Sequence, residues 1–274
     1  MSIVSEINRI NTNVANAYTQ AQSKGATLPQ SQNSANLANT INSISTGRDW
    51  SQIGYSSEPN VIDDGVEHAK EIMQNWDASQ TDHGSEFNGD TQLIFLPLVN
   101  TSSVIRCNNM FRACYRLIYI PQLNTASVKQ MGYTFYDCYA LKTISQLNTS
   151  NVENMGYTFG NCISLDKLPQ LNMEKVKYLV GMFTNCTALT ELGGFVNLGQ
   201  SYVTTTAANY SGYTLDLSSS PLLTHDSLMN VINNLYDIAT RGCNTQQLVL
   251  GSTNLAKLTA EEIAIATNKG WTVS

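Results

Sequence analysis

Histidines, acidic residues and cysteines are the side chains of this sequence whose types allow chemistry. The three histidines are His68, His83 and His225. His83 follows Asp82 and precedes Glu86 and Asp90 within one short segment. Carboxylate oxygens and imidazole nitrogens are ligands for cations in proteins. Residues 81–90 are therefore either a cation site or a solvated loop, and the loop is the interpretation we favour.

Catalytic motifs are absent from the sequence. It contains no G-x-S-x-G turn, phosphate-binding loop or dinucleotide-binding glycine pattern, and His68 has no zinc-protease partner four residues away. The acidic pairs Asp63-Asp64 and Glu261-Glu262 suit a loop and a helix start, where negative charge is favourable. We therefore predict a protein that is not an enzyme and holds no metal or cofactor.

Six cysteines are present, and four of them recur every 24 residues: Cys114, Cys138, Cys162 and Cys186. The other two are Cys107 and Cys243, and no close C-x-x-C pair of a zinc site occurs. A regular column favours small buried side chains over metal ligands. We predict free thiols, with a Cys107–Cys114 disulfide as the alternative.

The cysteine column belongs to a 24-residue repeat. Aromatic and aliphatic columns keep the same spacing: Phe111, Phe135, Phe159, Phe183; Leu117, Leu141, Leu165, Leu189; Ile120, Ile144, Leu168, Leu192; Val99, Leu123, Leu147, Leu171; Val104, Val128, Val152, Val176. An asparagine column runs through Asn100, Asn124, Asn148 and Asn172. A constant period of this length with regular leucine and asparagine is typical of a leucine-rich-repeat solenoid, in which each unit buries its neighbour's apolar face.

The predicted fold is therefore an α/β leucine-rich-repeat solenoid with repeats over 93–200. The L-x-x-I/L-x-x-L-N stretch predicts a short strand, and the M-x-x-x-F-x-x-C stretch predicts a short helix on the opposite side. Residues 201–274 predict further repeats and a cap. Strands are expected at 214–217, 247–250 and 271–273, with one helix opening near Thr224 and another at the Thr259/Glu262 capping box.

Two family resemblances are carried by these motifs. The stretches Leu147-Asn-Thr-Ser-Asn-Val-Glu-Asn-Met155 and Phe159-Gly-Asn-Cys-Ile-Ser-Leu165 resemble the BspA-like leucine-rich repeats of bacterial surface proteins. The C-terminal segment from Asn254 to Thr272 and the segment from Ser23 to Leu37 are similar to parts of bacteriophage tail and baseplate proteins. The first resemblance implies the solenoid fold, and the second implies a virion component assembled in the host cytoplasm.

An N-terminal arm, residues 1–45, precedes a connector and leading cap at 46–92, which includes a helix expected at 66–76. The arm carries an apolar seam with heptad spacing, made of Ile3, Ile7, Ile10, Val14, Ala17 and Ala21. β-branched residues at both seam positions favour three or more strands, so the arm predicts a coiled-coil homotrimer or a docking element. A second helix is expected at 30–45, and the alternative is that the two helices pack on each other or on a neighbour as a monomeric hairpin.

The side chains left for recognition lie between the core columns of the early repeats. They are Arg112, Tyr115, Arg116, Tyr119, Tyr133, Tyr136, Tyr139 and Tyr157. Tyrosine and arginine are enriched in binding hot spots, so these residues form the candidate surface patch. The alternative is that the rings pack on the edges of the coils.

Composition restricts the partners. Charged residues make up 13% of the chain, about half the usual share, and the net charge is −6. Phosphate neutralisation of nucleic acid is therefore disfavoured, and no apolar run approaches the roughly 18 residues of a membrane span. We expect a tail-fibre, receptor-binding or baseplate protein that contacts a host-surface glycan or protein, or other virion proteins. A bacterial surface adhesin and a head-fibre or capsid decoration protein are the alternatives.

Overall fold

The structure is a computed structural model that describes residues 61–203, 213–239 and 246–274. The chain divides into two units, Met1–Val66 and Glu67–Ser274, and helix α3 (Val61–Asn75) crosses the boundary. It contains most of the helix predicted at 66–76. The proposed trimer seam and the second arm helix lie outside the described residues. The second unit contains all the 24-residue repeats.

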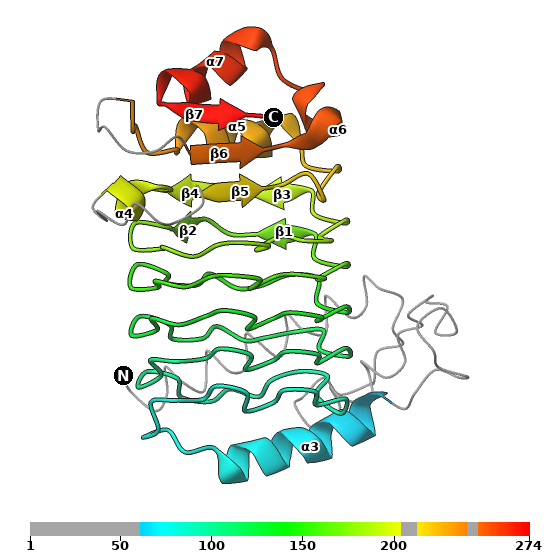
Figure 1. The fold of residues 1–274 in the computed structure, drawn as a ribbon. Coiled ribbons are helices and arrows are strands. Elements are labelled where there is room, and N and C mark those ends of the chain that lie inside the picture. Colours follow the sequence, from blue (N-terminus) through cyan, green and yellow to red (C-terminus); the bar gives the residue numbers. More distant parts are fainter. Residues whose placement is uncertain (1–60, 204–212, 240–245) are drawn as a thin grey trace, which may run out of the picture. The chain divides into compact units, whose positions relative to one another are not determined.

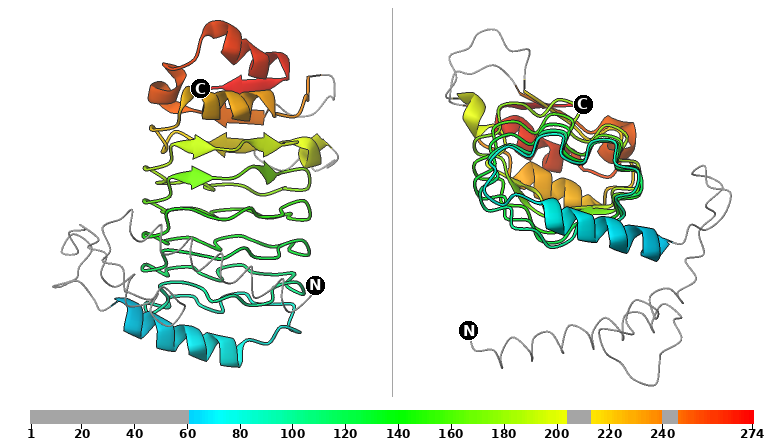
Figure 2. Two further views of the ribbon diagram at one scale, coloured as in Figure 1. Left: turned by 180° about the vertical axis from the view of Figure 1, so that it is seen from behind. Right: turned by 90° about the horizontal axis from the view of Figure 1, so that it is seen from below.

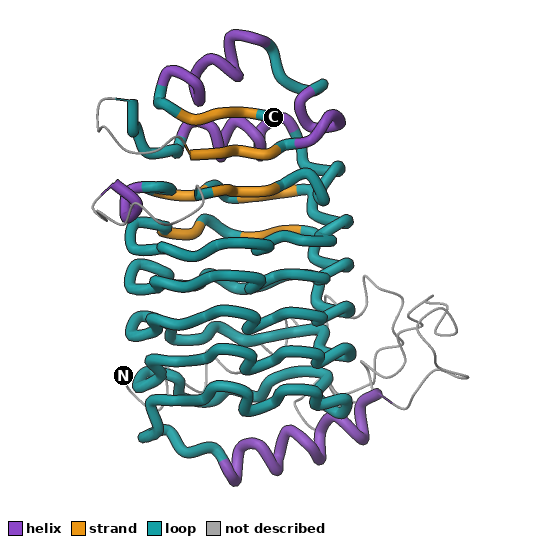
Figure 3. The backbone as a smooth tube through the Cα atoms, in the orientation of Figure 1, coloured by secondary structure: helices purple, strands orange, loops and turns teal. Residues whose placement is uncertain are grey.

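Stacked 24-residue coils form the body of this unit (Figure 1). Strands β1 (Lys167–Leu168) and β2 (Leu171–Asn172) pair in parallel with β3 (Glu191–Leu192) and β4 (Phe195–Val196), each residue facing the one 24 positions later. Single bridges such as Phe95 with Tyr119 repeat this register in earlier coils. The predicted short strand is confirmed at its expected place, although most of each coil is loop and turn (Figure 3).

The helix predicted for the M-x-x-x-F-x-x-C stretch is wrong. Residues 107–117, 131–141, 155–165 and 179–189, which we call the turn flank, run as consecutive turns. Alternate amides donate to the next coil, as Asn109 N does to the carbonyl of Gly132 (3.0 Å) and Phe111 N to that of Thr134 (2.9 Å). Asn109 has a φ of 57°. A helix needs negative φ and internal hydrogen bonds, so inter-coil pairing excludes it here.

A row of phenylalanines forms the centre of the core, as the repeat predicts. Phe111, Phe135, Phe159 and Phe183 are buried and stack one above the next, with ring centroids 5.5 to 5.7 Å apart. Phe87 adds a fifth ring at 5.5 Å from Phe111. The 24-residue register therefore extends back into residues 46–92, which were predicted to be the connector and leading cap.

His83 corrects the loop interpretation of 81–90. Its side chain is buried, because it occupies the core column that continues through Cys107 and Met131. It stacks on Trp76 with centroids 4.0 Å apart and planes inclined by 7°. Ile72 of α3 joins the same hydrophobic core. The end of α3 and Trp76 thus cover the first coil of the solenoid.

The C-terminal part contains α4 (Gln200–Val203), β5 (Thr214–Asp216), α5 (His225–Asn233), β6 (Gln246–Val249), α6 (Gly251–Leu255), α7 (Ala260–Asn268) and β7 (Trp271–Val273). The strands form a parallel sheet in the order β5-β6-β7. Thr224 caps α5, and Thr259 with Glu262 makes the expected capping box of α7. These predicted strands and helices are confirmed, and Figure 2 shows them closing one end of the stack of flattened coils.

Candidate binding surface

Tyrosines in successive coils stack along the turn flank. Tyr115 lies on Tyr139 with centroids 5.0 Å apart, and Tyr133 lies on Tyr157 at 4.9 Å. Each pair consists of residues 24 positions apart, so the coil spacing itself places one ring over the next. Tyr115 is 43% exposed and Tyr139 is 38% exposed. The stacking therefore fixes the ring orientations while leaving ring surface open to a partner.

Arg112 and Tyr136 join the second pair. The Arg112 guanidinium carbon lies 5.6 Å from the ring centroids of both Tyr133 and Tyr136, which is within the range of a cation–π contact. Tyr136 also meets Tyr133 edge-on. We call the set the tyrosine flank: Arg112, Tyr115, Tyr133, Tyr136, Tyr139 and Tyr157.

Glycines of the following coils make room for these rings. A Cβ atom at Gly160 would lie 2.8 Å from the Tyr136 ring, and one at Gly181 would overlap the Tyr157 ring. Gly160 and Gly181 stand where earlier coils carry the tyrosines themselves. Tyr136 and Tyr157 thus pack against the glycine of the following coil.

Asp137 lies beside the tyrosine flank. The pKa of Tyr139 is raised above its usual value. Partial burial is the larger cause, and the nearby Asp137 carboxylate is the second. The Asp137 carboxylate accepts a hydrogen bond from the Asn161 side chain (2.7 Å), and Asn161 accepts one from Asn185 (2.8 Å). This polar row runs next to the rings and holds one negative charge there.

Two predicted patch residues are placed differently. The backbone of Tyr119 pairs with Phe95 in the strand ladder, beyond the turn flank, and its side chain is 53% exposed. Arg116 reaches the carbonyl of Thr91 at 3.5 Å and is only partly exposed. The structure thus brings six of the eight predicted residues together in the tyrosine flank.

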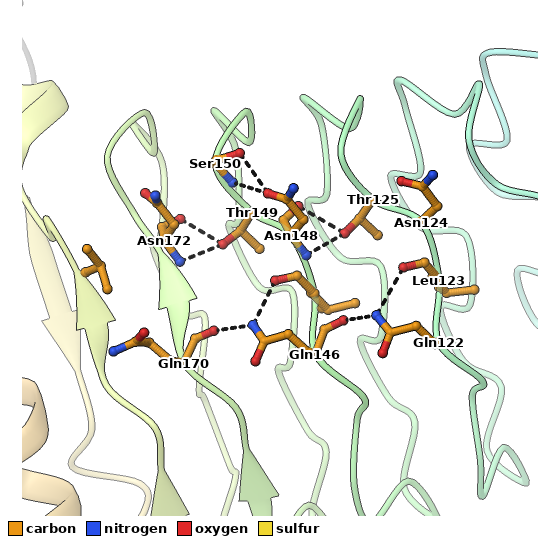
Figure 4. Close-up of a pocket in the computed structure, with 12 residues that line it drawn as sticks. Gln122, Leu123, Asn124, Thr125, Gln146, Asn148, Thr149, Ser150, Gln170 and Asn172 are labelled. Atoms are coloured by element: carbon orange, nitrogen blue, oxygen red, sulfur yellow. Dashed lines mark hydrogen bonds between the residues drawn. The ribbon is translucent and has the colours of Figure 1, made fainter.

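A groove that the sequence reasoning missed crosses three coils on the strand side. It has a volume of about 640 Å³. Two rows of amide side chains line it, and we call it the amide groove: Gln122, Gln146 and Gln170, with Asn124, Asn148 and Asn172 (Figure 4). The glutamines also recur every 24 residues, and this spacing was the available signal.

Threonines beneath the asparagine row hold neighbouring coils together. The Thr125 hydroxyl donates to the carbonyl of Asn148 (3.0 Å) and accepts from the amide of the same residue (2.8 Å). Thr149 makes the same pair with Asn172. A buried hydroxyl thereby satisfies both backbone groups of the next coil, and the groove floor has a fixed geometry.

In the part of the chain that is described, no cluster of three or more histidine, cysteine or acidic side chains is arranged to hold a metal ion. His68 instead contacts the Asp90 carboxylate at 2.6 Å. Among the described residues, no helix has the length and apolar character required to cross a membrane.

The chain is similar to one family model over its repeats and to a solved structure. Residues 63–142 and 85–193 match a family model described as "Mycoplasma protein of unknown function, DUF285". A leucine-rich-repeat protein of T. pallidum is 17% identical, with a TM-score of 0.42 over 70% of this chain and 77% of that one. No curated protein matches. The chain's own coils and columns make it a leucine-rich-repeat protein.

Proposed function

We propose that this chain is a non-enzymatic binding protein that presents the tyrosine flank to a partner macromolecule. The observation that carries the proposal is the set of stacked, half-exposed tyrosines fixed on rigid coils. Rigid aromatic side chains lose little conformational entropy on binding and dominate hot spots. Arg112 adds a positive charge that already lies against two of the rings.

The setting we propose is a phage virion, as a tail-fibre, receptor-binding or baseplate protein. In that setting the N-terminal seam assembles a homotrimer or docks to another virion protein, and the solenoid faces a host-surface component. The similarity of the termini to phage tail and baseplate proteins supports this setting.

A bacterial surface adhesin is the second candidate. The BspA-like character of the repeats favours it, since the resemblance is to bacterial surface proteins. Both settings use the same solenoid surface, so one binding experiment tests the surface and another tests the assembly.

The surface is tested with substitutions taken from other coils of the same column. Tyr115 and Tyr139 are replaced by Thr, the residue that their column carries at Thr187. Tyr133 is replaced by Asn, the residue that its column carries at Asn109, where the positive φ is nearly the same. Fluorescently labelled chain is measured on a panel of intact bacteria. We expect the triple variant to lose binding and to keep its melting temperature. Undiminished binding would refute the role of the tyrosine flank.

The assembly is tested by light scattering. Full-length protein is compared with a chain that begins after residue 45, and with a full-length variant carrying Ile7→Asn and Ile10→Asn. We expect a trimer mass that falls to a monomer in both altered chains. A mass unchanged by these alterations would count against the coiled coil and leave the surface proposal standing.

A further inference from the structure

Two of the three glutamines of the amide groove, Gln122 and Gln146, have a fixed orientation. The Gln146 Nε2 donates to the carbonyls of Leu147 (3.1 Å) and Gln170 (2.7 Å), and Gln122 contacts Leu123 and Gln146 in the same manner. Both hydrogens of the Gln146 amide are therefore used within the protein. Its Oε1 atom points away from these bonds, as Figure 4 shows. These two glutamines thus present hydrogen-bond acceptors at the coil spacing, about 4.8 Å.

The asparagine row has the opposite orientation. Asn148 Oδ1 accepts from the backbone amide of Ser150 (3.2 Å), and Asn124 and Asn172 accept from the amides of Ala126 and Glu174 in the same way. This local turn occupies the oxygen and leaves the Nδ2 group directed outward. Asn124 and Asn148 are exposed. The second row therefore presents hydrogen-bond donors at the same spacing.

The two rows lie on the same side of the strand segment. Gln122 and Asn124 are exposed, whereas Leu123 and Thr125 are buried. This alternation places the acceptor row and the donor row roughly 7 Å apart across the groove. No charged side chain is among the residues lining the groove.

We propose that the amide groove binds an extended, neutral polysaccharide along the axis of the solenoid. Sugar hydroxyls both donate and accept hydrogen bonds, so one sugar ring can satisfy an acceptor and a donor of one coil. An extended chain of 1,4-linked pyranose rings advances by a length close to the coil spacing, which allows successive rings to meet successive coils. A charged polymer would leave its charges without a partner in this lining.

The test is isothermal titration calorimetry on the full chain with cello-, chito- and xylo-oligosaccharides of one to six sugars. We expect at least one series to bind, with affinity rising up to about the length that spans three coils. Heparin and hyaluronan serve as charged controls and should not compete.

The matched variant is Asn124→Asp with Asn148→Asp. Aspartate keeps the oxygen that accepts from the backbone and therefore the turn, but it removes the outward donors. We expect affinity to fall at least about tenfold with an unchanged melting temperature. The tyrosine-flank variant Tyr115→Thr/Tyr139→Thr should bind the oligosaccharide as the unmodified chain does.

Three results would overturn the proposal. They are the absence of millimolar binding in all three series, equal affinity for the single sugar and the hexamer, and binding that the aspartate variant leaves unchanged. Because the tyrosine-flank variant is measured in parallel, none of these results depends on the proposed function of the tyrosines.

Discussion

The Cys138 thiol donates a hydrogen bond to the backbone carbonyl of Phe111 in the preceding coil, at 3.1 Å. The same carbonyl accepts from the amide of Cys114, also at 3.1 Å. A carbonyl oxygen has two lone pairs, and both are used although the site is fully buried. The contact recurs along the column, from Cys114 to Phe87, Cys162 to Phe135 and Cys186 to Phe159. This explains why a small side chain with a weak donor repeats there.

Replacing Cys138 by alanine tests this role. The change removes one partner of the Phe111 carbonyl and leaves a small void, so we expect a loss of about 1–2 kcal/mol in the free energy of unfolding. Urea unfolding followed by circular dichroism measures it. The substitution Tyr139→Thr at an exposed position is the control, and we expect it to change the free energy of unfolding by no more than about 0.5 kcal/mol. Equal values for the two variants would show that the thiol contact contributes nothing.

Thiol reactivity gives an independent prediction. Burial raises the pKa of Cys107, Cys114 and Cys186 to about 12, and raises those of Cys138 and Cys162 as well. The thiolate is the reactive form, so these five free thiols should resist a disulfide reagent in mildly alkaline buffer while the chain is folded. Cys243 lies outside the described residues and is replaced by serine for this measurement. Five thiols should react after denaturation, and rapid labelling of the native chain would contradict the burial.

The phenylalanine row predicts a larger effect. Phe135 is fully buried between Phe111 and Phe159. Its truncation to alanine removes ring contacts on both sides and opens a cavity, so we expect a loss of about 3–5 kcal/mol. Denaturant unfolding measures it, with Tyr139→Thr again as the exposed control. A loss below about 1 kcal/mol would mean that the row is not the centre of the core.

The sequence predicts the coils well because the buried residues recur every 24 positions along the chain. Columns such as Phe111 to Phe183 give the period, and the period gives the parallel register. The helix prediction was wrong because the spacing of apolar residues gives no information about the sign of the backbone φ angle. Residues such as Asp137 and Asn161, which favour positive φ, carried that signal. His83 was misassigned because one histidine replaces the apolar residue of its column.

The candidate surfaces were only partly predictable. Tyrosine and arginine are conspicuous by type, so the tyrosine flank could be named from sequence, but the room for the Tyr136 and Tyr157 rings depends on Gly160 and Gly181. The glutamine row was overlooked since a single exposed glutamine suggests nothing. Its orientation is set by carbonyls of the next coil, which only the folded chain brings into reach.

Ala113 gives a stabilising prediction. It has a φ of 59°, and the same column continues as Asp137, Asn161 and Asn185. Alanine is strained in this region, whereas asparagine tolerates it. Ala113→Asn should therefore raise the free energy of unfolding by about 0.5–1 kcal/mol, measured by urea unfolding. The control Ala113→Val should lower it, and a destabilised asparagine variant would refute the strain argument.

The contact between α5 and α7 predicts a pH dependence. His225 Nε2 lies 2.8 Å from the Glu262 carboxylate. The hydrogen bond to Glu262 raises the pKa of His225 above 6.5. The pKa of Glu262 is lowered below 4.5, mainly by the hydrogen bond from the Thr259 amide and secondly by the one from His225. The histidine contribution to stability is therefore complete below pH 6.5 and is lost as the pH rises through the elevated pKa. The glutamate contribution is complete above pH 4.5 and is lost as the pH falls through the depressed pKa.

Stabilisation by the pair should consequently be greatest between pH 4.5 and 6.5. His225→Gln removes the titration and retains a side chain able to form hydrogen bonds. The difference in melting temperature between the unmodified chain and this variant, followed from pH 4 to pH 9, should be largest in that window and shrink above it. The capping box between Thr259 and Glu262 is intact in both proteins, so it cancels in the comparison. A difference that grows with rising pH would reverse the predicted sign and show that His225 is stabilised in its neutral form.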